Sequence, residues 1–188
     1  KTLADLKGKR ISVGAAKSGT ELNALVVLGA AGIKYSDFAK VEYLPYDQSV
    51  ELLKNRQIDV TLQSAGLGNP ALRDLANSVD VVFVPVPAAV VARIGDKAYI
   101  AGAIPANTYK GQSAEVPTAS IINFLVTHEG VSAEVVYKMT KSMYENLGEL
   151  IAAHAAAKGI QRERAAVDMP IPLHPGAEKY YREVGLIK

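Results

Sequence analysis

The stretch Ile11-Ser-Val-Gly-Ala-Ala-Lys-Ser-Gly-Thr-Glu21 decides how the N-terminal half of this chain folds. Its β-branched start predicts a strand that stops at Gly14, and the turn through Ser18, Gly19 and Thr20 leads into an apolar helical pattern. The first N–H groups of a helix have no partner within the helix and lie at the positive end of its dipole. Such a turn suits a carboxylate or a phosphate, although Ser and Thr also begin helices as ordinary caps. Both interpretations are open at this point.

The size and composition of the chain narrow its class. A length of 188 residues suits one domain, or a domain with an arm. The 21 Lys and Arg and the 19 Asp and Glu are not clustered, which argues against a nucleic-acid surface. No run is long enough to predict a membrane-spanning helix. The lack of cysteine excludes disulfides, thiol chemistry and thiolate metal sites.

The first hundred residues alternate strand-like and helix-like segments. Strands are predicted at 10–13, 41–44, 58–62 and 79–84, and helices at 20–31, 48–55 and 71–76. In the first helix, we assign the buried face to Leu22, Leu25, Val26 and Leu28. This alternation predicts an α/β fold with a mostly parallel sheet and right-handed crossovers.

Ligands of such sheets bind beyond the carboxyl ends of the strands, and three segments of this chain fall there. The first is the turn at 18–20, the second contains Tyr46, and the third runs from Gln63 through Gly66 to Asn69. Tyr46 could stack on a ligand or donate a hydrogen bond to it, and simple packing is the alternative. The sequence therefore predicts a binding site at this edge.

The pattern changes after Pro85, where prolines interrupt short extended pieces. A further strand is predicted at 116–126, followed by a long Ala-rich helical segment that begins after Ser132. The tail, from Pro170 to Lys188, is expected to contain a short helix at 177–184. We divide the chain into an α/β lobe at 1–103, a crossover or hinge with a strand at 104–131, and a helical arm at 132–188.

The sequence offers groups for binding but no evident catalytic machinery. His128, His154 and His174 have no carboxylate or second histidine at the spacing of a metal site. Ser18 lacks the glycine pattern of a nucleophile elbow, and Asp59 is expected to be a cap or a surface charge. We therefore expect a protein that is not an enzyme and that needs no cofactor and no metal.

Four motifs, in order along the chain, resemble those of the TAXI-type solute-binding proteins of TRAP transporters. They are Leu6-Lys-Gly-Lys-Arg-Ile-Ser-Val-Gly14 with Ser18-Gly-Thr-Glu21, Ile58-Asp-Val-Thr-Leu-Gln-Ser-Ala-Gly66 with Gly68-Asn-Pro-Ala71 and Asp74-Leu-Ala76, Ile104-Pro105 with Tyr109-Lys-Gly111, and Pro172-Leu-His-Pro-Gly-Ala-Glu-Lys-Tyr-Tyr-Arg-Glu-Val-Gly185. Each motif alone is moderately specific. Together they extend over essentially the whole chain.

The resemblance implies a lobe of the type II periplasmic-binding-protein kind. It also implies a periplasmic or membrane-tethered receptor that captures a small organic anion, such as glutamate or a dicarboxylate, for a sodium-driven membrane permease. By this resemblance, Ser18, Gly19, Thr20, Gln63 and Gly66 line the wall of the binding cleft. Position alone adds Tyr46 and Asn69.

Members of that family carry another lobe of domain size before the part that this chain resembles. We therefore expect the chain to be a fragment or a clipped mature form, without its signal peptide and first lobe. The helical arm should then expose apolar side chains such as Val135, Met139 and Met143. Such a face predicts dimerisation or exchange of arms between two copies.

A second hypothesis comes from a different class of protein, because the same architecture serves as the effector-sensing domain of some regulators. A regulator would need a DNA-binding helix-turn-helix segment, and this sequence contains none. The upstream sequence would discriminate the two, since a receptor predicts a signal sequence and a regulator does not.

Overall fold

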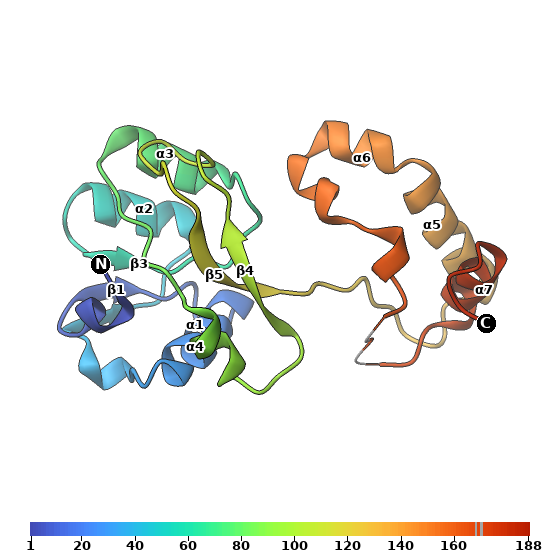
Figure 1. Ribbon diagram of the computed structural model, residues 1–188, viewed down its shortest axis with the longest axis horizontal. Helices are drawn as coiled ribbons and strands as arrows, with labels where there is room; N and C mark the ends of the chain where they lie inside the picture. Colours follow the sequence, from blue (N-terminus) through green and yellow to red (C-terminus); the bar gives the residue numbers. More distant parts are fainter. Residues whose placement is uncertain (168, 170) are drawn as a thin grey trace. The chain divides into compact units, whose positions relative to one another are not determined.

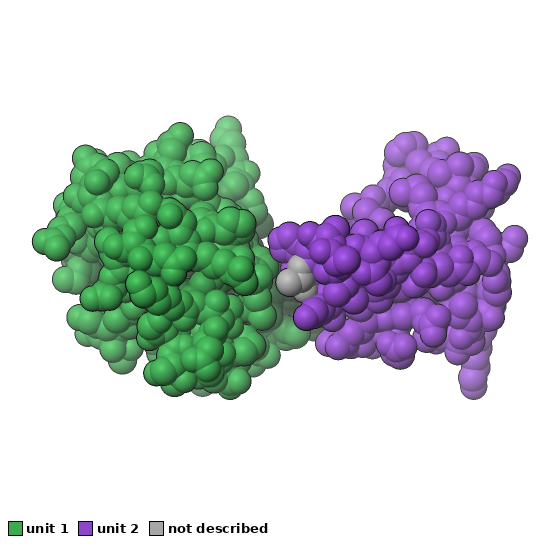
Figure 2. Space-filling model, turned by 90° about the horizontal axis from the view of Figure 1, so that it is seen from above, with its two compact units in different colours: residues 1–122 green, residues 123–188 purple. Residues whose placement is uncertain are grey.

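The computed structural model describes residues 1–167, 169 and 171–188 (Figure 1). Asp168 and Pro170, the second of which begins the predicted tail, lie outside the described residues. The chain forms two compact units, residues 1–122 and residues 123–188, coloured separately in Figure 2.

Unit 1 is built on a parallel sheet in the order β2-β1-β3, which confirms the predicted α/β class. Its strands are β1 (Arg10–Ser12), β2 (Lys40–Glu42) and β3 (Val60–Thr61). Its helices are α1 (Gly19–Ala30), α2 (Tyr46–Lys54), α3 (Pro70–Ser78) and α4 (Ala88–Ala92), with 3-10 turns η1 (Leu3–Leu6) and η2 (Tyr35–Asp37). A separate antiparallel pair, β4 (Tyr99–Ile104) and β5 (Val116–Ile121), follows.

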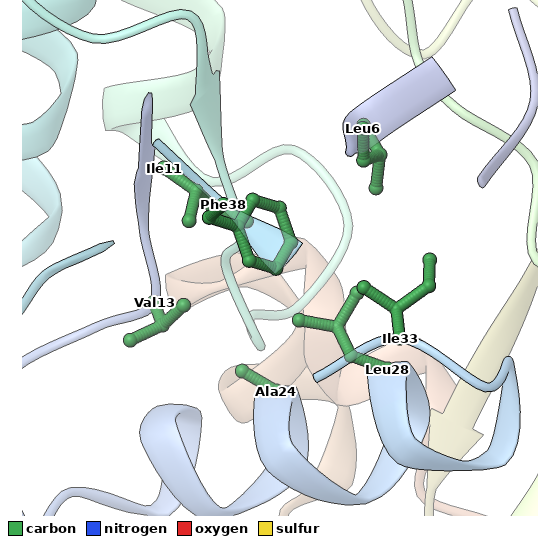
Figure 3. Close-up of a cluster of buried hydrophobic side chains, with 7 residues drawn as sticks. All are labelled: Leu6, Ile11, Val13, Ala24, Leu28, Ile33 and Phe38. Atoms are coloured by element: carbon green, nitrogen blue, oxygen red, sulfur yellow. The ribbon is translucent and has the colours of Figure 1, made fainter. Parts of the chain in front are cut away.

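The main core of unit 1 lies between the sheet and α1 (Figure 3). Ile11 and Val13 face Ala24 and Leu28, and all four side chains are almost completely buried. Burying an aliphatic side chain of the size of valine or leucine contributes about 1.5–3 kcal/mol each. This packing fixes α1 on the sheet and thereby fixes the position of its N-terminus.

The buried face predicted for α1 is partly wrong. Leu22 and Leu25 are 59% and 55% exposed, whereas Ala24, Val27 and Leu28 are buried. The helix is apolar on nearly every side, so its periodicity does not select one face. The buried side of the helix is the one that packs on the sheet through Ala24 and Leu28.

The strand predicted at 79–84 does not form. In the part of the chain that the structure describes, backbone hydrogen bonds hold only the two ends of residues 79–86. The Val79 N–H donates to the Leu75 oxygen, and the Val86 N–H donates to the Pro117 oxygen. Val82 is 65% exposed, so the apolar run is not buried on both faces. An apolar run forms a strand only where a neighbouring strand supplies hydrogen bonds, which sequence alone does not show.

The observed boundary between the units differs from the predicted division at 103 and 131. β5 pairs along its length with β4, and Tyr99 lies opposite Ile121 in this register. Residues 104–122 therefore belong structurally to unit 1, and unit 2 begins at Asn123. The hinge and the arm that packs on another lobe stay predictions.

Unit 2 is helical in its described residues. It contains α5 (Ala133–Glu145), α6 (Leu147–Ala153) and α7 (Pro175–Glu183), with 3-10 turns η3 (Ala155–Gly159) and η4 (Arg162–Arg164). The long predicted helix is interrupted at Asn146. α5 packs against α7 where a Cβ at Gly176 would lie 2.2 Å from the Ala133 oxygen, so only glycine allows this approach.

Tyrosine rings fill much of the contact between α5 and α7. The rings of Tyr144 and Tyr180 stack 5.9 Å apart, and Tyr137 and Tyr181 meet them edge to face. Outside this contact, Val135 is 47% and Met139 54% exposed, as predicted, while Met143 is half-buried. Dimerisation through this face stays a prediction.

Candidate functional site

The N-terminus of α1 begins from a tight turn that only glycine permits. Gly14 has a φ of +95°, and a Cβ there would lie 2.6 Å from the Thr20 side chain. Ser18 caps the helix, because its hydroxyl accepts the Glu21 N–H at 3.2 Å. Glu21 in turn accepts the Lys17 N–H, which closes the turn from the other side.

Two backbone donors remain open at this helix start. Among the described residues, the N–H groups of Gly19 and Thr20, the first two of α1, form no hydrogen bond. Gly19 is exposed, and a Cβ there would meet nothing within 4 Å. The Ser18 hydroxyl accepts from Glu21 and keeps its own proton for donation. These groups can bind an anion.

Thr20 holds this helix start against the neighbouring segments. Its hydroxyl lies 2.7 Å from the Tyr46 hydroxyl, which donates to the Ser64 carbonyl at 2.5 Å. A carbonyl oxygen can only accept, so the single Tyr46 proton is directed to Ser64 and Thr20 must donate to Tyr46. Thr20 is also buried. Its hydroxyl proton, and that of Tyr46, are therefore already used within the protein.

A second set of bonds joins the same segment to α1 and β4. The Asn23 amide nitrogen donates to the Ser64 hydroxyl at 2.9 Å, and the Tyr99 hydroxyl donates to the Asn23 amide oxygen at 2.7 Å. Burial raises the pKa of Tyr99, with a smaller contribution from Asp96, which keeps the phenol protonated as a donor. Residues of the 62–69 segment are thus tied to α1 at two points.

Gln63 lies in this segment with its amide unsatisfied. Both its amide nitrogen and its amide oxygen are buried without a hydrogen-bond partner in the described residues, as is the Thr61 hydroxyl. Leaving a buried donor or acceptor unpaired costs about 1–3 kcal/mol. Among the described residues of the predicted site, Gln63 thus has both polar atoms of its side chain buried without a hydrogen bond.

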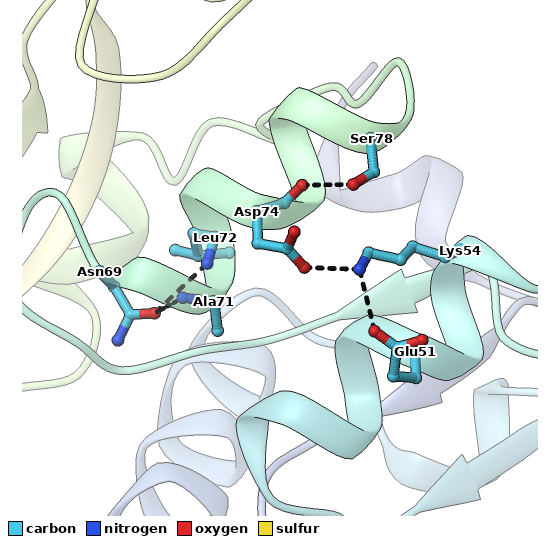
Figure 4. A network of polar contacts seen from close by, with 7 residues as sticks. All are labelled: Glu51, Lys54, Asn69, Ala71, Leu72, Asp74 and Ser78. Atoms are coloured by element: carbon cyan, nitrogen blue, oxygen red, sulfur yellow. Dashed lines mark hydrogen bonds and ion pairs between the residues drawn. The ribbon is translucent and has the colours of Figure 1, made fainter.

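Two other residues of the predicted site, Asn69 and Gly66, have no buried unpaired side-chain atom in the described residues. The Asn69 side-chain oxygen accepts the N–H groups of Ala71 and Leu72 at 2.9 and 3.3 Å, so it caps α3 (Figure 4). Gly66 is exposed in the preceding loop. The structure brings the 18–20 turn, Tyr46 and Ser64 together, and it gives Asn69 a local structural task. Whether the predicted residues bind a ligand stays a prediction.

Lys17 and Arg73 bring positive charge to these segments. Neither side chain forms an ion pair within the described part of the chain, and both are exposed. A Cβ built on Gly68 would lie 3.0–3.4 Å from three atoms of the Arg73 guanidinium group, so Arg73 lies over the loop that precedes α3. Glu21 contributes the opposing charge at the start of α1.

Sequence reasoning missed Asn23, Ser64, Tyr99 and Arg73. Asn23 had a signal, because it is the only polar residue in the apolar stretch from Leu22 to Leu28. Tyr99 had none, since it is 76 residues from its partner in the chain. Arg73 also had a signal, because it is a cation near the start of α3, the helix that follows β3 at the edge where ligands bind.

Other candidate chemistry has structural explanations. Asp59 accepts hydrogen bonds from the Arg10 backbone and guanidinium group at 2.7–3.0 Å and so joins β1 to the start of β3. His174 caps α7, since it accepts the Gly176 N–H and donates to the Val131 carbonyl. In the described ranges, no group of three His, Asp or Glu side chains could hold a metal ion.

A surface cavity of about 470 Å³ lies away from the predicted site. It is lined by the C-terminal ends of α2 and α3, with Lys54, Arg56 and Lys110 among its residues. Lys54 is paired there with Glu51 and Asp74 (Figure 4). Since α2 leads into β3, the part of the cavity that the end of α2 lines lies near the amino end of that strand.

The comparison with known families adds one finding. Residues 1–185 match the model of the NMT1-like family, so the chain belongs to this family of periplasmic-binding-protein-like proteins. Such proteins are in general substrate-binding proteins and are typically extracellular or periplasmic. No helix in the described residues is both long and apolar enough to cross a membrane.

Proposed function

We propose that this member of the NMT1-like family is the solute-binding component of a TRAP-type transporter of the TAXI class. It would capture a small organic anion, such as glutamate or a dicarboxylate, in the periplasm and deliver it to the membrane permease. The observation that carries the proposal is the N-terminus of α1, where the N–H groups of Gly19 and Thr20 remain open beside the 62–69 segment.

The binding mode follows from the open donors. A carboxylate at α1 would accept from the Gly19 and Thr20 N–H groups and from the Ser18 hydroxyl. Charge-assisted hydrogen bonds of this kind contribute about 1.5–3 kcal/mol each. The Thr20 and Tyr46 side chains would act indirectly, because their hydroxyl protons hold α1 to Ser64. Lys17 and Arg73 would supply positive charge against that of Glu21.

The proposal includes no catalysis. The Ser18 hydroxyl faces the Glu21 N–H and has no base described beside it. A nucleophile needs an adjacent base or a depressed pKa to be activated. The groups at α1 can therefore bind and orient an anion without attacking it.

The direct test is calorimetric titration of the full-length protein that contains this chain. The panel would contain L-glutamate, succinate and 2-oxoglutarate, with L-glutamine and glucose as probes of lower charge. We expect a carboxylate to bind at least tenfold more tightly than glucose. Binding of glucose alone would contradict the anion site. Failure of every acid, together with a cytoplasmic location, would favour the effector-sensing domain of a regulator.

A further inference from the structure

The point where the chain leaves unit 1 lies at one end of a chain of hydrogen bonds. Tyr99 begins β4 and lies opposite Ile121, the last residue of β5. The next residue, Ile122, donates its N–H to the Ala98 carbonyl at 3.1 Å, and unit 2 follows from Asn123. The backbone around Tyr99 is therefore the last part of unit 1 that the exiting chain contacts in this ladder.

From Tyr99, hydrogen bonds through Asn23 and Ser64 lead to Tyr46 at the candidate site. The Tyr99 hydroxyl donates to the Asn23 amide oxygen, and the Asn23 amide nitrogen donates to the Ser64 hydroxyl. The Ser64 carbonyl then accepts from Tyr46. The Asn23 amide is the link in this chain, because its oxygen accepts from Tyr99 and its nitrogen donates to Ser64, so loss of either partner leaves the amide partly unsatisfied.

We propose that Asn23 and Tyr99 are positioning residues for the candidate site, coupling the exit strands β4 and β5 to the 62–69 segment and the start of α1. This inference rests on the proposed function, in which the start of α1 binds an anion. Neither side chain needs to touch an anion. The bond from Asn23 holds Ser64 close to α1, and the bond from Tyr99 fixes the orientation of the Asn23 amide.

The coupling has a physical consequence in both directions. A movement of the exit strands that withdraws the Tyr99 hydroxyl frees the Asn23 amide and loosens Ser64. Conversely, an anion that orders the 62–69 segment favours the arrangement in which Tyr99 stays bonded to Asn23. Linkage requires these two effects to be reciprocal.

The test is hydrogen–deuterium exchange on the ligand-free, full-length protein, with Tyr99→Phe and Asn23→Ala as variants. We expect the amides of 62–69 to exchange about fivefold to tenfold faster in each, as suits the loss of one hydrogen bond. Because both act on one chain of bonds, the double variant should add little. Tyr43→Phe is the matched control, since Tyr43 is exposed and lies outside this chain of bonds.

The amides of β1 report whether the fold is intact, and they should exchange at the rate of the unchanged protein. Unchanged exchange in 62–69 for both variants, or faster exchange throughout unit 1, would overturn the proposal. Titration with L-glutamate and succinate is the second readout, and Tyr99→Phe should weaken the binding of whichever of them binds by about fivefold. If no acid of the panel, 2-oxoglutarate included, binds the unchanged protein, the proposed function fails, while the exchange result still decides the positioning role.

Discussion

Two helices of unit 1 begin at the carboxyl edge of the same sheet, yet their N-termini differ. At α3 the Asn69 side chain accepts two N–H groups, and Pro70 has none to offer, so no donor remains for a ligand. At α1 the Ser18 hydroxyl accepts only the Glu21 N–H and leaves those of Gly19 and Thr20 open. The choice of cap residue thus decides whether a helix start is closed or can bind an anion.

A serine cap alone does not make a site. α5 of unit 2 is capped by Ser132 in the same way, through the Val135 N–H. What distinguishes α1 is its surroundings, since Thr20, Tyr46 and Ser64 join its first turn to two other segments of the sheet edge. A change at the α3 cap should therefore lower stability without affecting binding, whereas the loss of a donor at the start of α1 should weaken binding.

The largest expected effect is that of Gly14→Ala on the open helix start. The new Cβ would meet Thr20 at 2.6 Å, and the φ of +95° is unfavourable for alanine. Strain at such a φ and overpacking each cost about 1–3 kcal/mol, so unit 1 should lose about 2–6 kcal/mol of unfolding free energy. Urea denaturation measures it, with Gly19→Ala as control because its Cβ meets nothing. Equal stability of the two variants would contradict the described turn.

A smaller effect is expected from Asn69→Ala at the closed helix start. Loss of this cap leaves two N–H groups of α3 without their partner and should cost about 1 kcal/mol of stability. Carboxylate binding should stay within about twofold of its original strength, since the comparison assigns Asn69 to the fold. A tenfold weaker binding at unchanged stability would make Asn69 a ligand contact and remove the contrast between the two helices.

The smallest effect concerns pH, at the opposite edge of the sheet. Hydrogen bonds from the Arg10 side chain hold the pKa of Asp59 well below its ordinary value of 3.8. Because the pKa is lower in the folded state, this pair stabilises the protein above about pH 4 and ceases to do so as pH falls further. The pair is partly exposed, so the loss should be small. Unfolding curves of Asp59→Asn should show a shallower decline below pH 4, and an identical decline would contradict the assignment.

The sequence predicted what depends on neighbouring residues. The start of α1 follows from the order of Ser18, Gly19 and Thr20, and the parallel sheet follows from the alternation of segments. Asn69 before Pro70 also carried a local signal for a cap, although its position at the sheet edge suggested a ligand group. Local chemistry thus fixed these elements to within a few residues.

Features that depend on distant partners could not be predicted in this way. Among the described residues, the segment expected as a strand at 79–84 forms none, and the exposure of Leu22 and Leu25 depends on which side of α1 packs on the sheet. The bonds of Asn23 to Ser64 and Tyr99 span 41 and 76 residues. No sequence period reports such pairs.

The most direct test of the open helix start removes one donor and nothing else. Proline at the first position of a helix lacks the N–H but suits the helical backbone, and the extended φ of −83° and ψ of 161° at Ser18 tolerate a following proline. We would titrate the tightest-binding carboxylate of the panel into Gly19→Pro and Gly19→Ala. The account predicts at least tenfold weaker binding, about 1.4 kcal/mol, for the proline variant and an unchanged affinity for the alanine variant. Equal affinities in both variants would contradict an anion site at the start of α1.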